Sequence, residues 1–206
     1  MYRAGAHQGF SSIWARAMRF CSDRRGVAAI EFAFIVPVLL IMYFVTMEAS
    51  QAIETSKKVG RIGSMVADLI TQQQTITAPD VDAIMKIGTS TLQPYRRSTP
   101  TIIVTAIQVT NETPPKVKVV WSRKLVEGTY TVDAAKDTIT TVPATLKIAD
   151  TFLIRVESKL GYKPIITWSA DSQKQLGLTS AFDSITMGET YYLRPRRSTT
   201  IPCSDC

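Results

Sequence analysis

Histidine and cysteine are scarce in this chain of 206 residues, and their scarcity narrows the chemistry that it can perform. The single histidine, His7, precedes every apolar segment, and the sequence contains no P-loop, dinucleotide-binding fingerprint or paired metal-ligand motif. Acidic pairs such as Asp80 and Asp82 are interpreted as groups that stabilise a helix N-terminus rather than as catalytic groups. We therefore expect no enzymatic activity, no cofactor, no bound metal and no small-molecule substrate.

The three cysteines are Cys21, Cys203 and Cys206. A single C-x-x-C motif lacks the second ligand pair of a structural zinc site, and a thioredoxin-like motif would stand at the start of a helix. The simplest interpretation is a small disulfide between Cys203 and Cys206. Such a bond requires an oxidising compartment.

The positive charge of the chain lacks the pattern of a nucleic-acid-binding surface. The formal net charge is +7, but lysine and arginine occur singly or in pairs, without interleaved aromatic residues. We expect no nucleic-acid partner and interpret the charge as a signal of membrane topology.

A long apolar run, Val27 to Met47, is interrupted only by Glu31, Pro37, Tyr43 and Thr46. At about 1.5 Å of rise per residue it matches a hydrocarbon core of about 30 Å. The alternative is a secretory signal peptide, whose apolar region is shorter, about 7–15 residues, and ends at a small-x-small cleavage site. Because the residues after Phe44 match that site poorly, we predict a retained transmembrane helix.

The basic residues on the two sides of this run predict its orientation. On the far side, Lys57, Lys58 and Arg61 are more distant and are diluted by Glu48 and Glu54. The positive-inside rule then predicts a cytoplasmic N-terminus and an exported C-terminal part. The preceding arginines are Arg3, Arg16, Arg19, Arg24 and Arg25.

Glu31 is unusual because it lies inside the apolar run. A carboxylate in the bilayer costs a few kcal/mol, so such residues usually face a partner or mark a function. Its position near the cytoplasmic end also allows the side chain to extend to the interface.

The residues around Glu31 carry a family resemblance. Gly26, four intervening residues, Glu31 and Phe32 reproduce the prepilin processing pattern, in which a basic leader ends in glycine. The run RRGVAAIEFAFIVPVLL, residues 24–40, closely resembles the start of TadE-like proteins, which are minor pilins, or pseudopilins, of the tight-adherence (Flp) type IV pilus system. The stretch MGETYYLRPRRSTTIPC, residues 187–203, resembles the family's ending more weakly, and both together cover about a sixth of the chain.

The resemblance implies a processing and assembly mechanism in a bacterial inner membrane. A prepilin peptidase would cut after Gly26, a residue that allows close approach of the backbone to an active site. The cut would expose an ammonium group on Val27, with which Glu31 could pair in a neighbouring subunit or in its own chain. The expected partners are the inner membrane, the peptidase, other minor pilins and pilus assembly proteins. The protein would stay in the assembly machine or join the pilus.

Pro37 admits two interpretations. It removes one helical hydrogen bond, so it could mark local unwinding during assembly. It could equally be an ordinary proline of a membrane helix, where such residues are tolerated.

The sequence predicts an α+β fold in which one long helix, from about Val27 to Gln73, carries a helix-backed and mostly antiparallel sheet. A second helix is expected from about Asp80 to Leu92, with Pro79 in its first turn. The segments TIIVTAIQVT and KVKVVWSRKL form an expected hairpin, and TFLIRVESKL, YKPIITW and SITMGETYYLR are further strand candidates, while Gly128 to Thr145 leaves strand and loop open. In the hairpin's second arm Val117, Val119 and Trp121 alternate with Lys116, Lys118 and Ser122. We therefore expect the face with the second set of residues to be exposed to solvent.

These elements suggest four segments. They are a cytoplasmic leader (1–26) removed on processing, a transmembrane helix (27–47), an exported continuation of that helix (48–75) and an exported α+β domain (76–206). Two alternatives to a minor pilin remain: an unprocessed single-pass membrane-anchored binding protein of the envelope, and an envelope enzyme for which no residues can be nominated. The mature N-terminus separates the first alternative from the pilin hypothesis.

Overall fold

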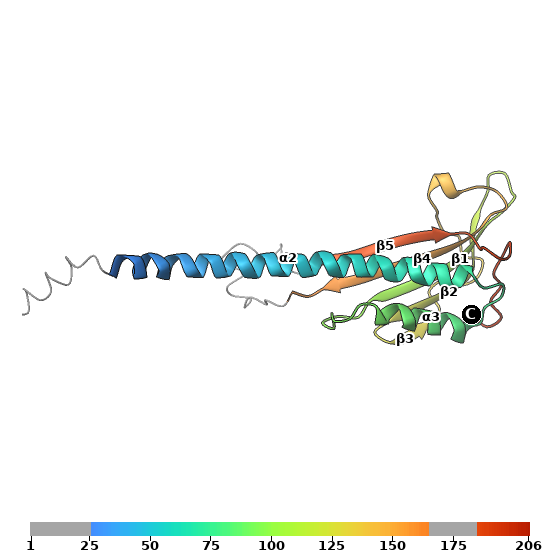
Figure 1. Cartoon of the computed structure of the whole chain (residues 1–206). Helices are drawn as coiled ribbons and strands as arrows, with labels where there is room; N and C mark the ends of the chain where they lie inside the picture. Colours follow the sequence, from blue (N-terminus) through green and yellow to red (C-terminus); the bar gives the residue numbers. More distant parts are fainter. Residues whose placement is uncertain (1–25, 165–184) are drawn as a thin grey trace, which may run out of the picture. The chain divides into compact units, whose positions relative to one another are not determined.

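The computed structural model describes residues 26–164 and 185–206, which Figure 1 traces along the chain. The chain divides into two compact units, Met1–Met47 and Glu48–Cys206. The leader up to Arg25, including Cys21, and most of the strand candidate YKPIITW lie outside the described residues.

The long predicted helix is present as α2, Val27–Thr71, with Pro37 inside it. Within the Glu48–Cys206 unit its buried stripe follows the predicted three- and four-residue steps through Val59, Ile62 and Val66. Ala67 is also fully buried, and the stripe then continues at Ile70 rather than at the expected Leu69, because a further step of four from Val66 keeps the same helix face toward the core. The helix ends where the backbone N–H of Arg196 donates to the Thr71 carbonyl at 2.9 Å.

The second helix, α3, spans Ala78–Ser90 and begins with a capping box. The Thr77 hydroxyl accepts from the backbone N–H of Asp80, and the Asp80 carboxylate accepts from the backbone N–H of Thr77. Asp80 thus supports the helix N-terminus as predicted. Asp82 lies beyond the first turn, and its carboxylate accepts two hydrogen bonds from Arg123 of the sheet, at 3.0 and 2.6 Å.

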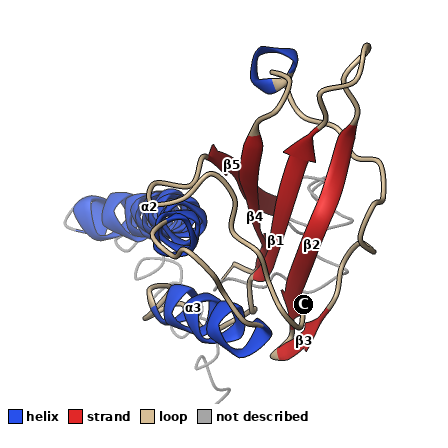
Figure 2. Cartoon of the chain, turned by 90° about the vertical axis from the view of Figure 1, so that its right-hand side faces the viewer, coloured by secondary structure: helices blue, strands red, loops and turns tan. Residues whose placement is uncertain are grey.

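Five antiparallel strands form one sheet in the order β3-β2-β1-β4-β5. The predicted hairpin pairs β1 with β2, β4 lies on the other side of β1, and β5 forms an edge next to β4. Figure 2 shows α2 and α3 on the same side of this sheet, so the expected α+β fold is confirmed. The strands are β1 (Thr101–Val109), β2 (Val117–Val126), β3 (Thr129–Thr131), β4 (Phe152–Tyr162) and β5 (Ile185–Leu193), and a 3-10 helix, η2, spans Ala144–Leu146.

The main core fills the space between the helices and the sheet. Its residues come from α2, α3 and the inner face of the strands, and their alternation along β4 leaves the charged side chains of Arg155, Glu157 and Lys159 on the other face. Among the fully buried members are Ile62, Val66, Met85, Ile102, Ile154 and Leu160.

The prediction of one shared face for Val117, Val119 and Trp121 is wrong. A β-bulge shifts the register of β1 and β2, so that Trp121 lies opposite Ala106 whereas Val119 lies opposite Ile107. Trp121 therefore joins the main core, while Val117 belongs to a second cluster with Ile107.

The outer face of β2 is also less exposed to solvent than predicted. Backbone hydrogen bonds of Val119 with Asp137 and Thr138 place the segment after β3 along the free edge of β2, and Val142 and Leu146 beyond it pack against the cluster that contains Val117. Ser122, expected to face water, is buried and anchors the segment: its hydroxyl donates to the Ala134 carbonyl at 2.8 Å. The ambiguous stretch from Gly128 is thus the short strand β3 followed by a covering loop.

Candidate functional site

The residues singled out by the processing pattern lie at the start of α2. The helix begins at Val27, immediately after Gly26, so Val27 and Glu31 are separated by one helical turn. Side chains four residues apart lie on the same helix face, with Cβ atoms about 5–6 Å apart. The side chains of Val27 and Glu31 therefore lie on the same face of the helix.

Glu31 and Phe32 are both exposed in the structure. Within residues 26–164 and 185–206, the Glu31 carboxylate has no hydrogen bond and no ion pair. The described part of the chain thus leaves the carboxylate available to a group that appears only after processing or in another molecule.

Gly26 has free space around it. A Cβ atom built on this residue would meet no heavy atom of the described chain within 4 Å. A requirement for glycine at this position therefore does not come from packing within the described fold.

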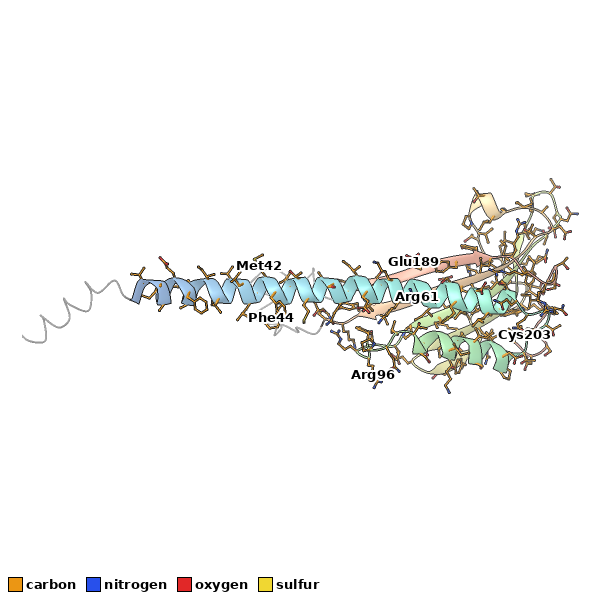
Figure 3. The ribbon with its side chains drawn as sticks, in the orientation of Figure 1. Met42, Phe44, Arg61, Arg96, Glu189 and Cys203 are labelled. Atoms are coloured by element: carbon orange, nitrogen blue, oxygen red, sulfur yellow. A yellow bond between two sulfur atoms is a disulfide. The ribbon has the colours of Figure 1, made fainter. Side chains whose placement is uncertain are left out.

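The first part of α2 carries the apolar side chains predicted to enter a membrane. They are exposed all around the helix, and Figure 3 shows side chains such as Met42 and Phe44 standing away from its backbone. Within the described residues one helix, Val27–Thr71, is long and apolar enough to cross a bilayer, and its most apolar stretch contains no buried residue. A helix that is apolar on all sides suggests a single-pass membrane anchor.

Pro37 does not interrupt the hydrogen-bonded course of α2, although it cannot donate to the preceding turn. The predicted residues Gly26, Val27, Glu31, Phe32 and Pro37 thus fall within three helical turns of one segment. Both interpretations of Pro37 stay predictions.

A second group of functional candidates lies at the start of the Glu48–Cys206 unit. The Tyr162 hydroxyl donates to the Glu48 carboxylate, and the Arg97 guanidinium lies over the rings of Tyr95 and Tyr162, 4.9 and 5.6 Å from their centroids. Burial first, and then the bond to Glu48, raise the pKa of Tyr162 to about 12. The phenol therefore stays protonated and keeps donating at physiological pH.

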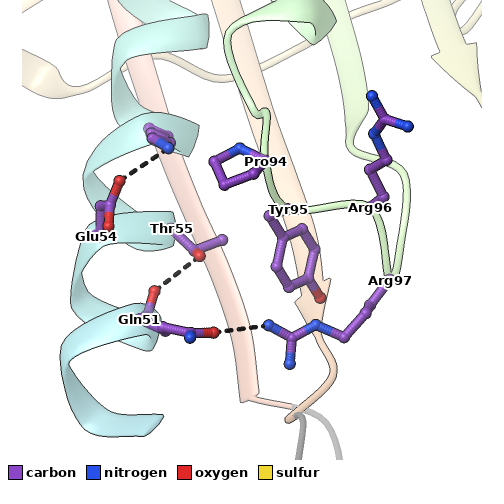
Figure 4. Close-up of a pocket in the computed structure, with 8 residues that line it drawn as sticks. Gln51, Glu54, Thr55, Pro94, Tyr95, Arg96 and Arg97 are labelled. Carbon is purple, nitrogen blue, oxygen red and sulfur yellow. Dashed lines mark hydrogen bonds and ion pairs between the residues drawn. The ribbon is translucent and has the colours of Figure 1, made fainter. Parts of the chain in front are cut away.

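Arg97 is held at the edge of an open cleft of about 410 Å³ (Figure 4). Its Nη2 atom donates to Gln51 Oε1 at 2.9 Å. The Nη1 atom is buried and has no hydrogen-bond partner within the described residues, since Glu48 lies 3.9 Å away. The cleft is lined by Gln51, Glu54, Thr55, Lys58, Pro94, Tyr95, Arg96 and Arg97.

Sequence reasoning missed this cleft. It interpreted QPYRRSTP, residues 93–100, only as the end of a helix. The motif of an aromatic residue and two arginines between prolines could have predicted a cationic site, because a turn of this kind holds cations at a fixed place. What the sequence did not contain was the pairing of this turn with Gln51, which lies more than forty positions earlier.

The C-terminal segment carries the other predicted pair. The structure joins Cys203 and Cys206 in a disulfide, with Cα atoms 5.7 Å apart. Residues next to it complete the fold: Asp205 accepts from the backbone N–H of Ala78 at 2.7 Å, and the Ile201 carbonyl accepts from Trp121 Nε1 at 2.8 Å. Figure 3 places Cys203 and Arg96 at opposite ends of the Glu48–Cys206 unit.

Comparisons with known proteins bear on the N-terminal segment alone. Comparison with curated proteins and with solved structures found no match. The model of one family, described as TadE-like protein, matches residues 26–59, which include Gly26, Val27, Glu31, Phe32 and Pro37. This family is a structural, pilus-associated kind of protein, and the match implies a part in Flp (tight-adherence) pilus assembly. Residues 26–59 thus match the TadE-like family model, in agreement with the resemblance found in the N-terminal sequence.

Proposed function

We propose that the protein is a minor pilin of a Flp pilus, cut after Gly26 by a prepilin peptidase and anchored in the bacterial inner membrane by residues 27–47. The observation that carries this proposal is the family match over residues 26–59, which contains the whole processing pattern. The exported part would help to start, cap or position a pilus used in surface attachment.

The position of Gly26 supports the proposed cleavage. It directly precedes the first helical residue, Val27, and no described atom lies within 4 Å of the place where its side chain would be. A protease needs an extended and accessible backbone at the cut bond, and glycine offers the least hindrance to its active site.

The relation of Val27 to Glu31 supports the proposed assembly step. Cleavage turns the backbone nitrogen of Val27 into an ammonium group, and Glu31 is the acidic residue of the same apolar run. Inside a bilayer an isolated charge is costly, so the two groups would stabilise each other when subunits meet. The pair would thereby select the register in which a subunit leaves the membrane.

Gly26→Ala is expected to retain the leader. A methyl group at the cut bond would hinder the peptidase, and we expect cleavage at least about tenfold slower, which corresponds to about 1.4 kcal/mol of activation free energy. Mass spectrometry of the full chain, co-expressed with a prepilin peptidase and extracted from membranes, measures the result. The unaltered chain should begin at Val27 and the variant at Met1.

Gly161→Ala is the matched control for this experiment, because its Cβ atom also meets nothing within 4 Å of the described chain. It should be processed normally. An unaltered chain that keeps its Met1 end in the presence of an active peptidase would instead support the unprocessed membrane-anchored binding protein.

The proposed export of the C-terminal unit makes a separate prediction about its cysteines. In the periplasm Cys203 and Cys206 should be oxidised, since that compartment maintains disulfides whereas the cytoplasm reduces them. Thiol labelling of intact spheroplasts with a membrane-impermeant maleimide should label both residues only after reduction. Labelling without a reductant would contradict the disulfide, and protection even after reduction and unfolding of the exposed part would contradict the orientation.

A further inference from the structure

The cleft at the start of the Glu48–Cys206 unit carries more positive than negative charge. Lys58, Arg96 and Arg97 line it together with one acid, Glu54. The ion pair of Glu54 with Lys58, at 2.8 Å, lowers the pKa of this carboxyl, so Glu54 is ionised and already engaged. Three cationic side chains against one anionic side chain leave an excess of two positive charges among the lining residues.

The charges behind the lining do not remove this excess. Glu48 lies 3.9 Å from Arg97 and accepts the Tyr162 hydroxyl. Counting Glu48 as one more acid lowers the excess to one positive charge and does not remove it.

The cationic groups differ in how firmly they are held. Arg97 is fixed by the rings of Tyr95 and Tyr162 and by its bond to Gln51. Arg96 is exposed, and its guanidinium donates to the Gln93 side chain at 3.3 Å. An exposed guanidinium such as that of Arg96 can donate two parallel hydrogen bonds to the oxygens of a phosphate, and Arg97 beside it supplies a fixed positive charge.

One wall of the cleft follows the predicted span closely in sequence. Gln51 lies four positions after that span, which is no more than about 15 Å of extended chain. Basic residues near an anionic membrane surface are attracted to it. Gln51, Glu54 and Lys58 thus belong to the part of the chain that directly follows the proposed anchor.

We propose that this cleft binds the phosphodiester headgroup of an anionic phospholipid in the membrane that the anchor crosses. The proposal rests on the membrane anchoring proposed above, but not on cleavage after Gly26. Lipid binding would hold the exported unit against the outer surface of the inner membrane until the subunit leaves the bilayer.

Native mass spectrometry of the full chain in detergent tests this proposal. Phosphatidylglycerol and phosphatidylcholine are added separately, and the dissociation constant of each is measured for the unaltered chain, Lys58→Gln/Arg96→Gln and the control Lys86→Gln/Lys147→Gln. Both variants remove two positive charges, and the control residues are exposed and lie outside the cleft. Circular dichroism checks that each variant folds.

We expect the unaltered chain to prefer phosphatidylglycerol and the cleft variant to bind it at least about tenfold more weakly, on the basis of about fivefold per basic residue. Phosphatidylcholine binding should not change, and the control should behave as the unaltered chain does. Equal affinity for the two lipids, or an equal loss in both variants, would overturn the proposal. Competition by soluble glycerophosphate at the same concentration as the lipid would also overturn it, because it would identify a site for free phosphate.

The same spectra report the mass of the N-terminus. A chain that keeps its leader but prefers phosphatidylglycerol through the cleft would contradict the proposed processing alone. A processed chain without that preference would contradict the lipid site alone.

Discussion

Cells that express Glu31→Ala in place of the unaltered chain should contain the protein in their membranes at a normal level but should lack pili. The Glu31 side chain is exposed in the structure, so its loss removes no contact of the described fold. It does remove the only acid of the apolar run, and the ammonium group on Val27 would then be buried without a partner. Loss of one partner of a buried ion pair costs about 3–5 kcal/mol, which is at least about a hundredfold in assembly.

Electron microscopy of surface pili and immunoblots of the membrane fraction measure the two parts of this result. Glu31→Gln keeps the size of the side chain and should fail in the same way, because the charge is what pairs with the ammonium group. Glu54→Gln is the control, since Glu54 also lies on α2 but outside the apolar run. Normal piliation in Glu31→Ala would refute the role that we assign to this carboxylate.

Gly63→Leu should have the largest effect on the Glu48–Cys206 unit. A Cβ atom at this position would lie 2.9 Å from both Ser158 Oγ and Tyr191 Cδ2, so α2 and the sheet approach each other here more closely than any side chain permits. Glycine weakens a helix relative to alanine, and this close packing accounts for its presence here. We expect a loss of about 3 kcal/mol in the free energy of unfolding, which lowers the melting temperature by roughly 6–12 °C.

Thermal denaturation of the full chain in detergent, followed by circular dichroism, checks this value. Gly60→Ala is a milder neighbour on the same helix, because its Cβ atom would first meet the Tyr191 hydroxyl, the far end of a side chain, at 3.2 Å. Gly161→Ala has open space and should change little. A melting temperature for Gly63→Leu equal to that of Gly161→Ala would show that the close approach of α2 to β4 and β5 is absent in solution.

The sequence predicted most of the regular structure because local signals agree with it. Alternating apolar residues identified the hairpin and β4, and Pro79 near Asp80 identified the start of α3. The prediction failed at Trp121, where a bulge changed the face of the strand. A bulge depends on how two strands pair, and the pattern of one strand does not report its partner.

The two functional candidates also differ in this way: the processing pattern is a local sequence signal, whereas the cleft depends on tertiary contacts. Gly26, Val27, Glu31 and Phe32 are close in sequence and lie on one helix, so their spacing alone was enough to predict a site. The cleft joins α2 to a turn more than forty positions later, through contacts such as that of Gln51 with Arg97. The local sequence of two arginines in a loop does not indicate which aromatic rings and which amide side chain the arginines will contact in the folded protein.

The amino-acid sequence alone determined the apolar helix, the acid within it and the family resemblance of residues 26–59, because each of these is a property of a short continuous segment. Only the tertiary structure decided which glycine of α2 lies against the sheet, what covers the outer face of β2 and where positive charge collects in a cleft of the Glu48–Cys206 unit. Those features arise from packing between distant segments, and packing is settled when side chains meet in space rather than by their order along the chain.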